Sequence, residues 1–419
     1  MTIEELQTYK RILLLGYAKE GKGTESFLKK FVPNAEVLHA DQKDGSDYLK
    51  AQDGCDLVIK TPGIPSALVT KPYTTATNIF FSNVRALVSN PTIIGVTGSK
   101  GKSTTVSLIS QTLTVGGLTV RLAGNIGVPM LSLLESNQPE STVFVLELSS
   151  YMLEDLRQAP DIALFLNFFP EHLDYHHTLE SYFGAKAGMT LRQTDNDIFV
   201  YPENDLFIAP LATRTKARPI PIVDALPFET KDLPLKGEHN LLNMRATYTV
   251  VRQLGVSKEK AKEAFEHFTP LPHRMQYIGE YKHIAFYDDA IATAPEPTAY
   301  AIKTIAHVET IFLGGTDRGL TYEKLAQAVC ESQIKHIVLF PDTGKKIMDA
   351  IRVTCNRRFD ILETTSMKEA VEYAYRHTSP GTSCLLSCAA PSYTLWKDFE
   401  EKGDVFQKFV EELGKSVTS

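Results

Sequence analysis

A glycine-rich run with lysine and hydroxyl side chains, Thr97–Thr104 (TGSKGKST), is the part of this sequence best suited to chemistry. An apolar strand, Ile93–Val96, precedes it, and helical apolar spacing follows it at Val106, Ile109 and Leu113. This layout is typical of a phosphate cradle, because glycines let backbone N–H groups approach an anion and the helix amino terminus is partly positive. The run therefore predicts a site for nucleotide phosphates, with an ordinary glycine turn as the alternative.

The lysine and the hydroxyl groups of this cradle predict how the phosphates are held. The pattern is the short form G-x-x-G-K-S, Gly98–Ser103, because a full Walker A motif would need glycine at Val96. Lys102 is expected to reach the outer phosphates, and the hydroxyl of Ser103 or Thr104 is expected to contact Mg²⁺.

Polar residues follow two further strands of the same region. Glu147 comes after the apolar run 142–146, and His172 comes shortly after the run 162–166. Because ligands bind at the carboxyl ends of parallel strands, Glu147 is a candidate magnesium ligand and His172 a candidate metal or substrate contact. The alternatives are a solvated or helix-capping glutamate and an ordinary hydrogen-bonded histidine.

Three amides and one lysine lie in short motifs near these strands. Asn125 lies in a glycine-flanked turn (GNIG), and Asn240 and Asn243 stand three residues apart, on one face of a predicted helix. Lys186, in the run YFGAK, would on residue type alone be a lysine on the surface of a helix.

The composition excludes several classes of protein. A chain of 419 residues is expected to form two to three domains. The hydrophobic content of 43% and charged content of 22% are typical of a soluble globular protein, and a net charge of −6 argues against nucleic acid or a membrane surface as partner. The polar amino terminus predicts no signal peptide, and no apolar run approaches the ~18 residues of a membrane span.

The cysteines give no sign of a metal site. They are scattered and have neither C-x-x-C pairs nor histidines at ligand spacing. We therefore expect reduced thiols and a cytoplasmic protein. The residues concerned are Cys55, Cys330, Cys355, Cys384 and Cys388.

Short apolar strands alternate with helical segments along the whole chain, which predicts α/β domains with parallel sheets covered on both faces. Proline-containing breaks at Asn90-Pro91 and Thr269–Pro272 divide the chain into residues 1–89, 90–271 and 272–419. In the first domain a strand, Ile12–Leu15, leads into a glycine loop, Gly16–Gly23, and a helix. Two interpretations of that loop remain, a nucleotide contact or a plain turn.

Eight motifs in one order give nearly the whole chain a family resemblance. They are T-G-S-x-G-K-S-T, G-N-I-G, E-L-S-S-Y-x-L, N-x-x-x-x-H-L-D with a following A-K, G-x-H-N-x-x-N, H-R, L-G-G-x-D-R-G and L-L-S-x-A-x-x-S. In this order they resemble the Mur ligases, the ATP-dependent amino-acid ligases of peptidoglycan precursor synthesis. The resemblance implies a Rossmann-like N-terminal domain for a uridine nucleotide, a central P-loop-like ATPase domain with a mainly parallel sheet, and a Rossmann-like C-terminal domain for amino acid and ATP.

The resemblance also implies roles for single positions. The catalytic residues would be Lys102, Glu147, His172 and Lys186, with Lys186 as a carbamate, and two Mg²⁺ ions would be held by Ser103, Glu147, His172 and Lys186. ATP would be bound by Gly98, Ser99, Lys100, Gly101, Lys102, Ser103, Thr104, Asn240, Asn243, Arg274 and Asp289. The uridine-nucleotide substrate would be bound by Lys19, Glu20, Asp41, Lys43, Gly63 and Asn125, and the amino acid by Thr293, Arg318, Ser392, Tyr393 and Phe399.

The implied reaction joins glutamate to UDP-N-acetylmuramoyl-L-alanine with ATP, in a cytoplasmic monomer without nucleic-acid or membrane partners. Phosphorylation turns the carboxylate into an acyl phosphate, which an amine can attack. A guanidinium at Arg318 suits one carboxylate of the acceptor, and the hydroxyls near Ser392 suit a second. D-glutamate is the implied acceptor. The alternatives are L-glutamate, a ligase of the folylpolyglutamate synthase type, a kinase or simple ATPase, and a non-catalytic nucleotide-binding protein.

Three positions depart from the family pattern. Ile291 and Arg318 stand where many relatives carry lysine, and Tyr175 stands where an arginine often follows H-L-D. Because Ile291 cannot make an ionic contact, one carboxylate of the acceptor must be held differently.

Overall fold

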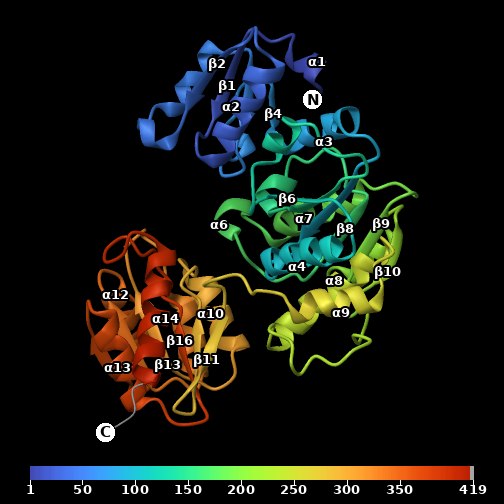
Figure 1. The fold of residues 1–419 in the computed structure, drawn as a ribbon. Coiled ribbons are helices and arrows are strands. Elements are labelled where there is room, and N and C mark those ends of the chain that lie inside the picture. Colours follow the sequence, from blue (N-terminus) through green and yellow to red (C-terminus); the bar gives the residue numbers. More distant parts are fainter. Residues whose placement is uncertain (416–419) are drawn as a thin grey trace. The chain divides into compact units, whose positions relative to one another are not determined.

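The computed structural model describes residues 1–415, which contain three β-sheets (Figure 1). These residues form two compact units. Unit 1 comprises residues 1–235 and 240–268 and holds the first two sheets, and unit 2 comprises residues 236–239 and 269 onward and holds the third sheet. The finer division at residues 89 and 271 stays a proposal.

The first sheet has the order β2-β1-β3-β4, and each of its strand pairs is parallel. Its strands are β1 (Arg11–Leu15), β2 (Glu36–Ala40), β3 (Leu57–Lys60) and β4 (Tyr73–Thr75), and the helices of this region are α1 (Ile3–Leu6), α2 (Lys19–Phe31) and α3 (Ala76–Leu87).

The second sheet has the order β10-β9-β8-β5-β7-β6 and is also parallel throughout. Its strands are β5 (Thr92–Thr97), β6 (Val120–Gly124), β7 (Val143–Glu147), β8 (Ile162–Phe165), β9 (Ile198–Tyr201) and β10 (Arg218–Pro221). The helices here are α4 (Lys102–Val115), α5 (Ser150–Leu153), α6 (Leu173–His176), α7 (Leu179–Leu191), α8 (Glu238–Arg252) and α9 (Lys258–Glu266).

Helix α3 joins the first two sheets into one unit. Its apolar residues, among them Phe80 and Phe81, are buried in a single core with side chains of both sheets. The ring of Phe80 lies 5.5 Å from that of Phe144 on β7. One continuous core therefore contains side chains of both sheets within unit 1.

The third sheet has the order β11-β12-β16-β13-β14-β15. One face is covered by α10, α11 and α12 and the other by α13 and α14. The strands are β11 (Gln276–Tyr281), β12 (Ile284–Asp288), β13 (Val308–Gly314), β14 (His336–Phe340), β15 (Asp360–Glu363) and β16 (Ser383–Leu386). The helices are α10 (Pro295–Thr304), α11 (Glu323–Glu331), α12 (Gly344–Thr354), α13 (Met367–His377) and α14 (Phe399–Lys415).

The edge of this third sheet differs from the parallel arrangement that the sequence predicts. Strand β11 runs antiparallel to β12, and the two residues between them, Lys282 and His283, have φ of +52° and +64°. A two-residue hairpin of this kind usually carries Asn-Gly or Asp-Gly. Lys-His gives no such signal, so the hairpin could not be read from the sequence.

The expectation that all five cysteines are free thiols is wrong for two of them. Cys330 on α11 and Cys355 after α12 form a disulfide, with their Cα atoms 6.1 Å apart. The pairing follows from the packing of α11 beside α12, which a sequence separation of 25 residues does not reveal. Cys55, Cys384 and Cys388 are free and buried. Within residues 1–415, no helix has the length and apolar character needed to cross a membrane.

Candidate active site

Three neighbouring strands of the second sheet end beside the glycine-rich loop. In the parallel register Val96 of β5 pairs with Glu147 of β7, and the N–H of Leu166, just after β8, donates to the carbonyl of Thr97 at 3.0 Å. The cradle therefore begins between Glu147 and the polar segment that follows β8. This is the carboxyl edge of the sheet, where ligands of α/β proteins bind.

Gly101 and Asn243 meet at the start of α4. Gly101 has φ of +83°, and a Cβ placed on it would lie 2.4 Å from Oδ1 of Asn243. A side chain at position 101 would therefore be strained and would collide with the amide. Asn243 donates to Asn240 at 3.1 Å, so both predicted asparagines lie next to the cradle.

The two lysines of the cradle have different partners. Lys102 is the first residue of α4, and its ammonium donates to the carbonyl oxygens of Gly98 and Ser99, both at 2.9 Å. Lys100 pairs with Glu171 at 2.7 Å. The side chain of Lys102 thus folds back over its own loop.

The structure adds residues to the site that sequence reasoning had not selected. Asn167 accepts a hydrogen bond from the N–H of Lys100 at 2.9 Å and donates to the carbonyl of Lys100 at 3.0 Å. The hydroxyl groups of Ser99 and Tyr182 lie 3.1 Å apart. Asn167 and Tyr182 therefore fix the shape of the cradle. In the sequence, Asn167 could have been identified by its position directly after an apolar strand.

Glu147 is buried, with 1% of its surface exposed. Its Oε1 accepts a hydrogen bond from Asn125 at 2.9 Å, and the N–H of Asn125 donates to the carbonyl of Glu147 at 3.0 Å. Its other oxygen, Oε2, is buried and has no hydrogen-bond partner among residues 1–415. A buried carboxylate oxygen without a donor is costly unless a cation binds it, so this atom fits a metal ligand.

His172 begins the short helix α6 with φ of +54°. Its ring lies 5.0 Å from that of Tyr151 and 5.9 Å from that of Tyr182. The His172 side chain is exposed, and desolvation by the surrounding protein is the first cause that lowers its pKa; the charges of Lys102 and Lys186 lower it further against the opposing charge of Glu171. A neutral imidazole is the form that can bind a metal.

Lys186 is not the surface lysine that residue type and spacing predicted. It is 1% exposed on α7, where its ammonium donates to the carbonyl of Gly98 at 2.8 Å and to the hydroxyl of Thr97 at 3.3 Å. Burial and, after it, the charge of Lys102 hold the pKa of Lys186 far below its usual value. A lowered pKa favours the uncharged amine more than in an exposed lysine.

The described part of the chain contains no cluster of three or more His, Cys, Asp or Glu side chains that could hold a metal ion by themselves. Mg²⁺ is commonly held by one or two protein groups together with water and substrate phosphates. Glu147, His172 and the hydroxyl of Ser103 fit that kind of site.

The residues predicted for the uridine nucleotide lie near the carboxyl edge of the first sheet. Lys19 donates to the carbonyl of Gly127 at 2.7 Å and so reaches the turn that contains Asn125. Burial raises the pKa of Glu20 to about 7. Asp41 accepts hydrogen bonds from the N–H groups of Tyr17 and Lys43. Gly63 is exposed in the loop after β3.

In unit 2, Asp289 is held at the end of β12. Its carboxylate accepts hydrogen bonds from Ser387 at 2.8 Å and from the N–H of Met275 at 3.2 Å. Arg274 lies between His273 and Met275 in the chain. The imidazole Nδ1 of His273 lies 2.7 Å from a carboxylate oxygen of Asp288. The ring centroids of His273 and Phe399 lie 6.1 Å apart.

Two further loops of unit 2 bring together three of the residues predicted for the amino acid. The N–H of Thr316 donates to the carbonyl of Pro391 at 2.8 Å. Arg318 lies over the ring of Tyr393, 6.0 Å from its centre, and 64% of Tyr393 is exposed. The hydroxyl of Ser392 is buried without a hydrogen-bond partner among the described residues. No contact places Thr293 beside these loops in the described residues.

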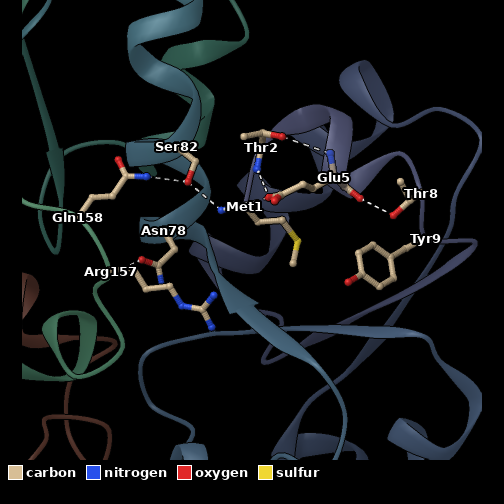
Figure 2. A pocket seen from close by; sticks show the side chains of 9 residues that line it. All are labelled: Met1, Thr2, Glu5, Thr8, Tyr9, Asn78, Ser82, Arg157 and Gln158. Atoms are coloured by element: carbon tan, nitrogen blue, oxygen red, sulfur yellow. Dashed lines mark hydrogen bonds and ion pairs between the residues drawn. The ribbon is translucent and has the colours of Figure 1, made fainter.

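Figure 2 shows a separate pocket of unit 1, lined by side chains of α1, α3 and the loop after α5. The hydroxyl of Ser82 accepts hydrogen bonds there from the amino group of Met1 at 2.7 Å and from Gln158 at 3.1 Å. None of the residues predicted to be functional lines it. The candidate site is therefore the cradle and not this pocket.

Comparison with known proteins is consistent with this geometry. Residues 96–225 match the Mur ligase middle domain, and residues 273–390 match the Mur ligase glutamate ligase domain. The UDP-N-acetylmuramoylalanine–D-glutamate ligases of Bacillus cereus (strain AH820) and Bacillus anthracis (strain A0248) are each 32% identical to this chain, over 98% of this chain and 99% of the relative.

Solved structures share the fold at lower identity. MurF of Acinetobacter baumannii has a TM-score of 0.61 at 16% identity and covers 98% of each chain. The UDP-N-acetylmuramate–alanine ligase MurC of Thermotoga maritima has a TM-score of 0.56 at 19% identity, over 97% of this chain and 99% of that one. The predicted α/β architecture is confirmed.

Proposed function

The chain belongs to the Mur ligase family, and from that premise we propose that it adds D-glutamate to UDP-N-acetylmuramoyl-L-alanine in a reaction that converts ATP to ADP. The observation that carries this proposal is the 32% identity, over 98% of the chain, to relatives that bear the name of this activity. The product is a precursor of peptidoglycan.

The residues around the cradle suit the first half of such a reaction. The N–H groups at the start of α4 and the ammonium of Lys102 would bind the phosphates, and Asn240 and Asn243 lie beside them. The carboxylate of the muramoyl substrate attacks the terminal phosphorus, and ADP leaves. Since phosphoryl transfer depends on positioned positive charge, the rigid loop and its lysine are the main contribution of the protein.

Metal binding is a further part of the proposal. Oε2 of Glu147, the imidazole of His172 and the hydroxyl of Ser103 would hold Mg²⁺. Mg²⁺ would neutralise charge on the phosphate oxygens. Asn125, bound to Oε1 of the same glutamate, would orient that carboxylate.

We also propose that Lys186 acts as a carbamate. Its burial and lowered pKa favour the neutral amine, the form that reacts with carbon dioxide. The resulting anion would lie in a site with several lysines and would be attracted by the charge of Lys102. The carbamate would then serve as a further oxygen ligand for the metal.

The second half of the reaction requires the acceptor amine. Arg318 and the neighbouring hydroxyl of Ser392 are proposed to hold the two carboxylates of D-glutamate, with Thr293, Tyr393 and Phe399 around it. The amine attacks the acyl phosphate, an amide bond forms, and phosphate leaves. Lys19, Glu20, Asp41, Lys43 and Gly63 are proposed to hold the uridine nucleotide. A cytoplasmic monomer is the proposed state of the protein.

The test is ADP release measured with UDP-N-acetylmuramoyl-L-alanine and each of D-glutamate, L-glutamate, D-aspartate and D-alanine. D-glutamate is expected to give the highest kcat/KM, with no ADP in the absence of an acceptor. A preference for D-alanine would contradict the dicarboxylate site, and a preference for L-glutamate would contradict the proposed configuration. Release of ADP without any acceptor would indicate a simple ATPase.

A further inference from the structure

The loop after β3, Thr61–Ser66 (TPGIPS), carries Gly63, one of the residues proposed for the uridine nucleotide. The loop leaves the first sheet at its carboxyl edge. Its two prolines have no N–H to donate. The N–H groups of Thr61 and Ile64 donate to the carbonyls of Leu15 and Thr61, at 2.9 and 3.1 Å. The carbonyls of Pro65 and Ser66 accept hydrogen bonds from the N–H groups of Leu68 and Val69, both at 3.0 Å, whereas side chains from other parts of unit 1 approach those of Pro62 and Ile64.

A buried ion pair holds this loop from one side. Lys60, the last residue of β3, is completely buried, and its ammonium lies 2.6 Å from Asp155 and donates to the carbonyl of Ile64 at 3.1 Å. Asp155 also accepts hydrogen bonds from Ser66 at 3.0 Å and Tyr73 at 2.8 Å. Because a buried ammonium is costly unless it is paired, the position of Asp155 fixes Lys60 and both ends of the loop.

Tyr175 holds the loop from the other side. Its hydroxyl donates to Glu154 at 2.9 Å and lies 3.4 and 3.5 Å from the carbonyl oxygens of Pro62 and Ile64. Burial and the hydrogen bond to Glu154 raise the pKa of Tyr175, so the hydroxyl keeps its proton. Because the single proton of the hydroxyl is donated to Glu154, Lys60 is the donor to the carbonyl of Ile64, and Tyr175 packs against the loop beside it.

The residues that hold the loop are directly connected to the proposed catalytic residues. Glu154 and Asp155 follow α5, and α5 begins three residues after Glu147. The ring of Tyr175 lies 4.6 Å from that of Tyr151, which in turn lies 5.0 Å from the ring of His172. The loop is therefore held by the same short segments that carry the proposed metal ligands.

We propose that Glu154, Asp155 and Tyr175 are positioning residues that set the Thr61–Ser66 loop for the uridine-nucleotide substrate. The inference rests on the ligase function proposed above and deepens it. These residues do not touch reacting atoms. They hold the nucleotide loop in its binding geometry before substrate arrives, so that less ordering is needed on binding. Tyr175 is one of the three departures from the family pattern.

The test uses two mild variants, Tyr175→Phe and Ser66→Ala, each of which removes one hydroxyl. The KM for UDP-N-acetylmuramoyl-L-alanine and the Kd for uridine diphosphate, measured by titration calorimetry, should each rise about fivefold, the effect of one lost hydrogen bond. The KM values for ATP and glutamate should not change. Glu154→Ala should match Tyr175→Phe, and the double variant should be no worse than either, since the two residues act through one contact.

A matched control is Tyr375→Phe in unit 2, which removes a tyrosine hydroxyl that donates to the carbonyl of Val410 at 2.6 Å. This variant should lose a similar amount of stability and leave every KM unchanged. Unchanged nucleotide KM and Kd in Tyr175→Phe, or an equal rise in all three KM values, would overturn the inference. A wild-type protein that binds uridine diphosphate but ligates nothing would refute the proposed function instead, and the Kd values would still decide the inference.

Discussion

The proposed phosphate site of unit 1 and the proposed acceptor site of unit 2 are built in opposite ways. Glu147 and Lys186 are each 1% exposed and are fixed by hydrogen bonds to backbone or amide groups. In unit 2, Arg318 lies over a tyrosine that is 64% exposed. Groups that must shift a pKa or hold a metal need burial, whereas recognition of a charged amino acid can use side chains at the surface.

The largest effect is expected for Lys102→Ala. Loss of this cation should lower kcat/KM at least about a thousandfold, because positioned charge is the main source of rate in phosphoryl transfer. The fold should survive, since the ammonium contacts carbonyl groups of its own loop. ADP release and circular dichroism would measure the two effects, with Lys368→Ala on the exposed face of α13 as control. Near-normal turnover in Lys102→Ala would contradict the role of Lys102 in phosphate binding and the contrast between the phosphate site and the acceptor site.

A smaller effect is expected from removing carbon dioxide. Exhaustive removal of carbon dioxide and bicarbonate at mildly acidic pH should lower activity about a hundredfold, because the site loses a proposed anionic metal ligand. Lower pH favours loss of the carbamate, because a protonated amine cannot hold carbon dioxide. Added bicarbonate should restore activity, and ¹³C-bicarbonate should give a carbamate signal that Lys186→Ala lacks. Full activity without bicarbonate would show that Lys186 acts as an unmodified lysine.

A substitution of Glu309 tests whether a buried charge in unit 2 stabilises the fold. Burial would raise its pKa, but hydrogen bonds from Lys335, Ser379 and Thr382 outweigh burial and lower the pKa to about 2. Stabilisation by the ionised carboxylate is therefore complete above the unfolded pKa of about 4.5 and is lost as pH falls toward 2. Glu309→Gln should lower the free energy of unfolding by about 2 kcal/mol at pH 7, and by less at pH 3. Fluorescence of Trp396, the single tryptophan, would report unfolding of unit 2. A pH-independent difference would contradict this role.

The smallest effect is expected for Arg318→Ala. Loss of one partly exposed guanidinium should raise the KM for glutamate about tenfold, as for a hydrogen bond to a charged group, and leave that for ATP unchanged. Arg352→Ala, on the exposed face of α12, is the matched control and should change neither value. A parallel rise in the KM for ATP would mean that Arg318 contributes to the nucleotide site as well, and the two sites would not be separate.

Local signals in the sequence were sufficient for the cradle. A strand, a glycine turn and a helix are adjacent in the chain, so Gly101 and Lys102 could be assigned without knowledge of the packing. Glu147 was selected because it follows an apolar run, and the structure places it at the end of β7; its role as a metal ligand stays a prediction. The Mur ligase resemblance supplied the remaining roles, and most of these stay predictions.

Features that depend on packing could not be predicted in this way. Lys186 is buried because it lies in the stretch 186–190 of α7 that packs into the protein, together with Met189, and the order of polar and apolar residues along α7 did not mark this position as buried. The pairing of Cys330 with Cys355 depends on α11 lying beside α12. The contacts of Tyr175 join segments more than a hundred residues apart in sequence.

One carbonyl oxygen in the cradle has a consequence for how nucleotide binding begins. The carbonyl of Gly98 accepts a hydrogen bond from Lys102 at 2.9 Å and one from Lys186 at 2.8 Å. In the proposed site, an arriving phosphate would compete with the loop itself for Lys102 and exchange one partner of this lysine for another. Departure of Lys102 would leave Lys186 as the remaining nitrogen donor to that oxygen and so change the surroundings of the buried amine. The proposed binding of ATP and the proposed carbamate at Lys186 would in this way be linked through a single backbone atom.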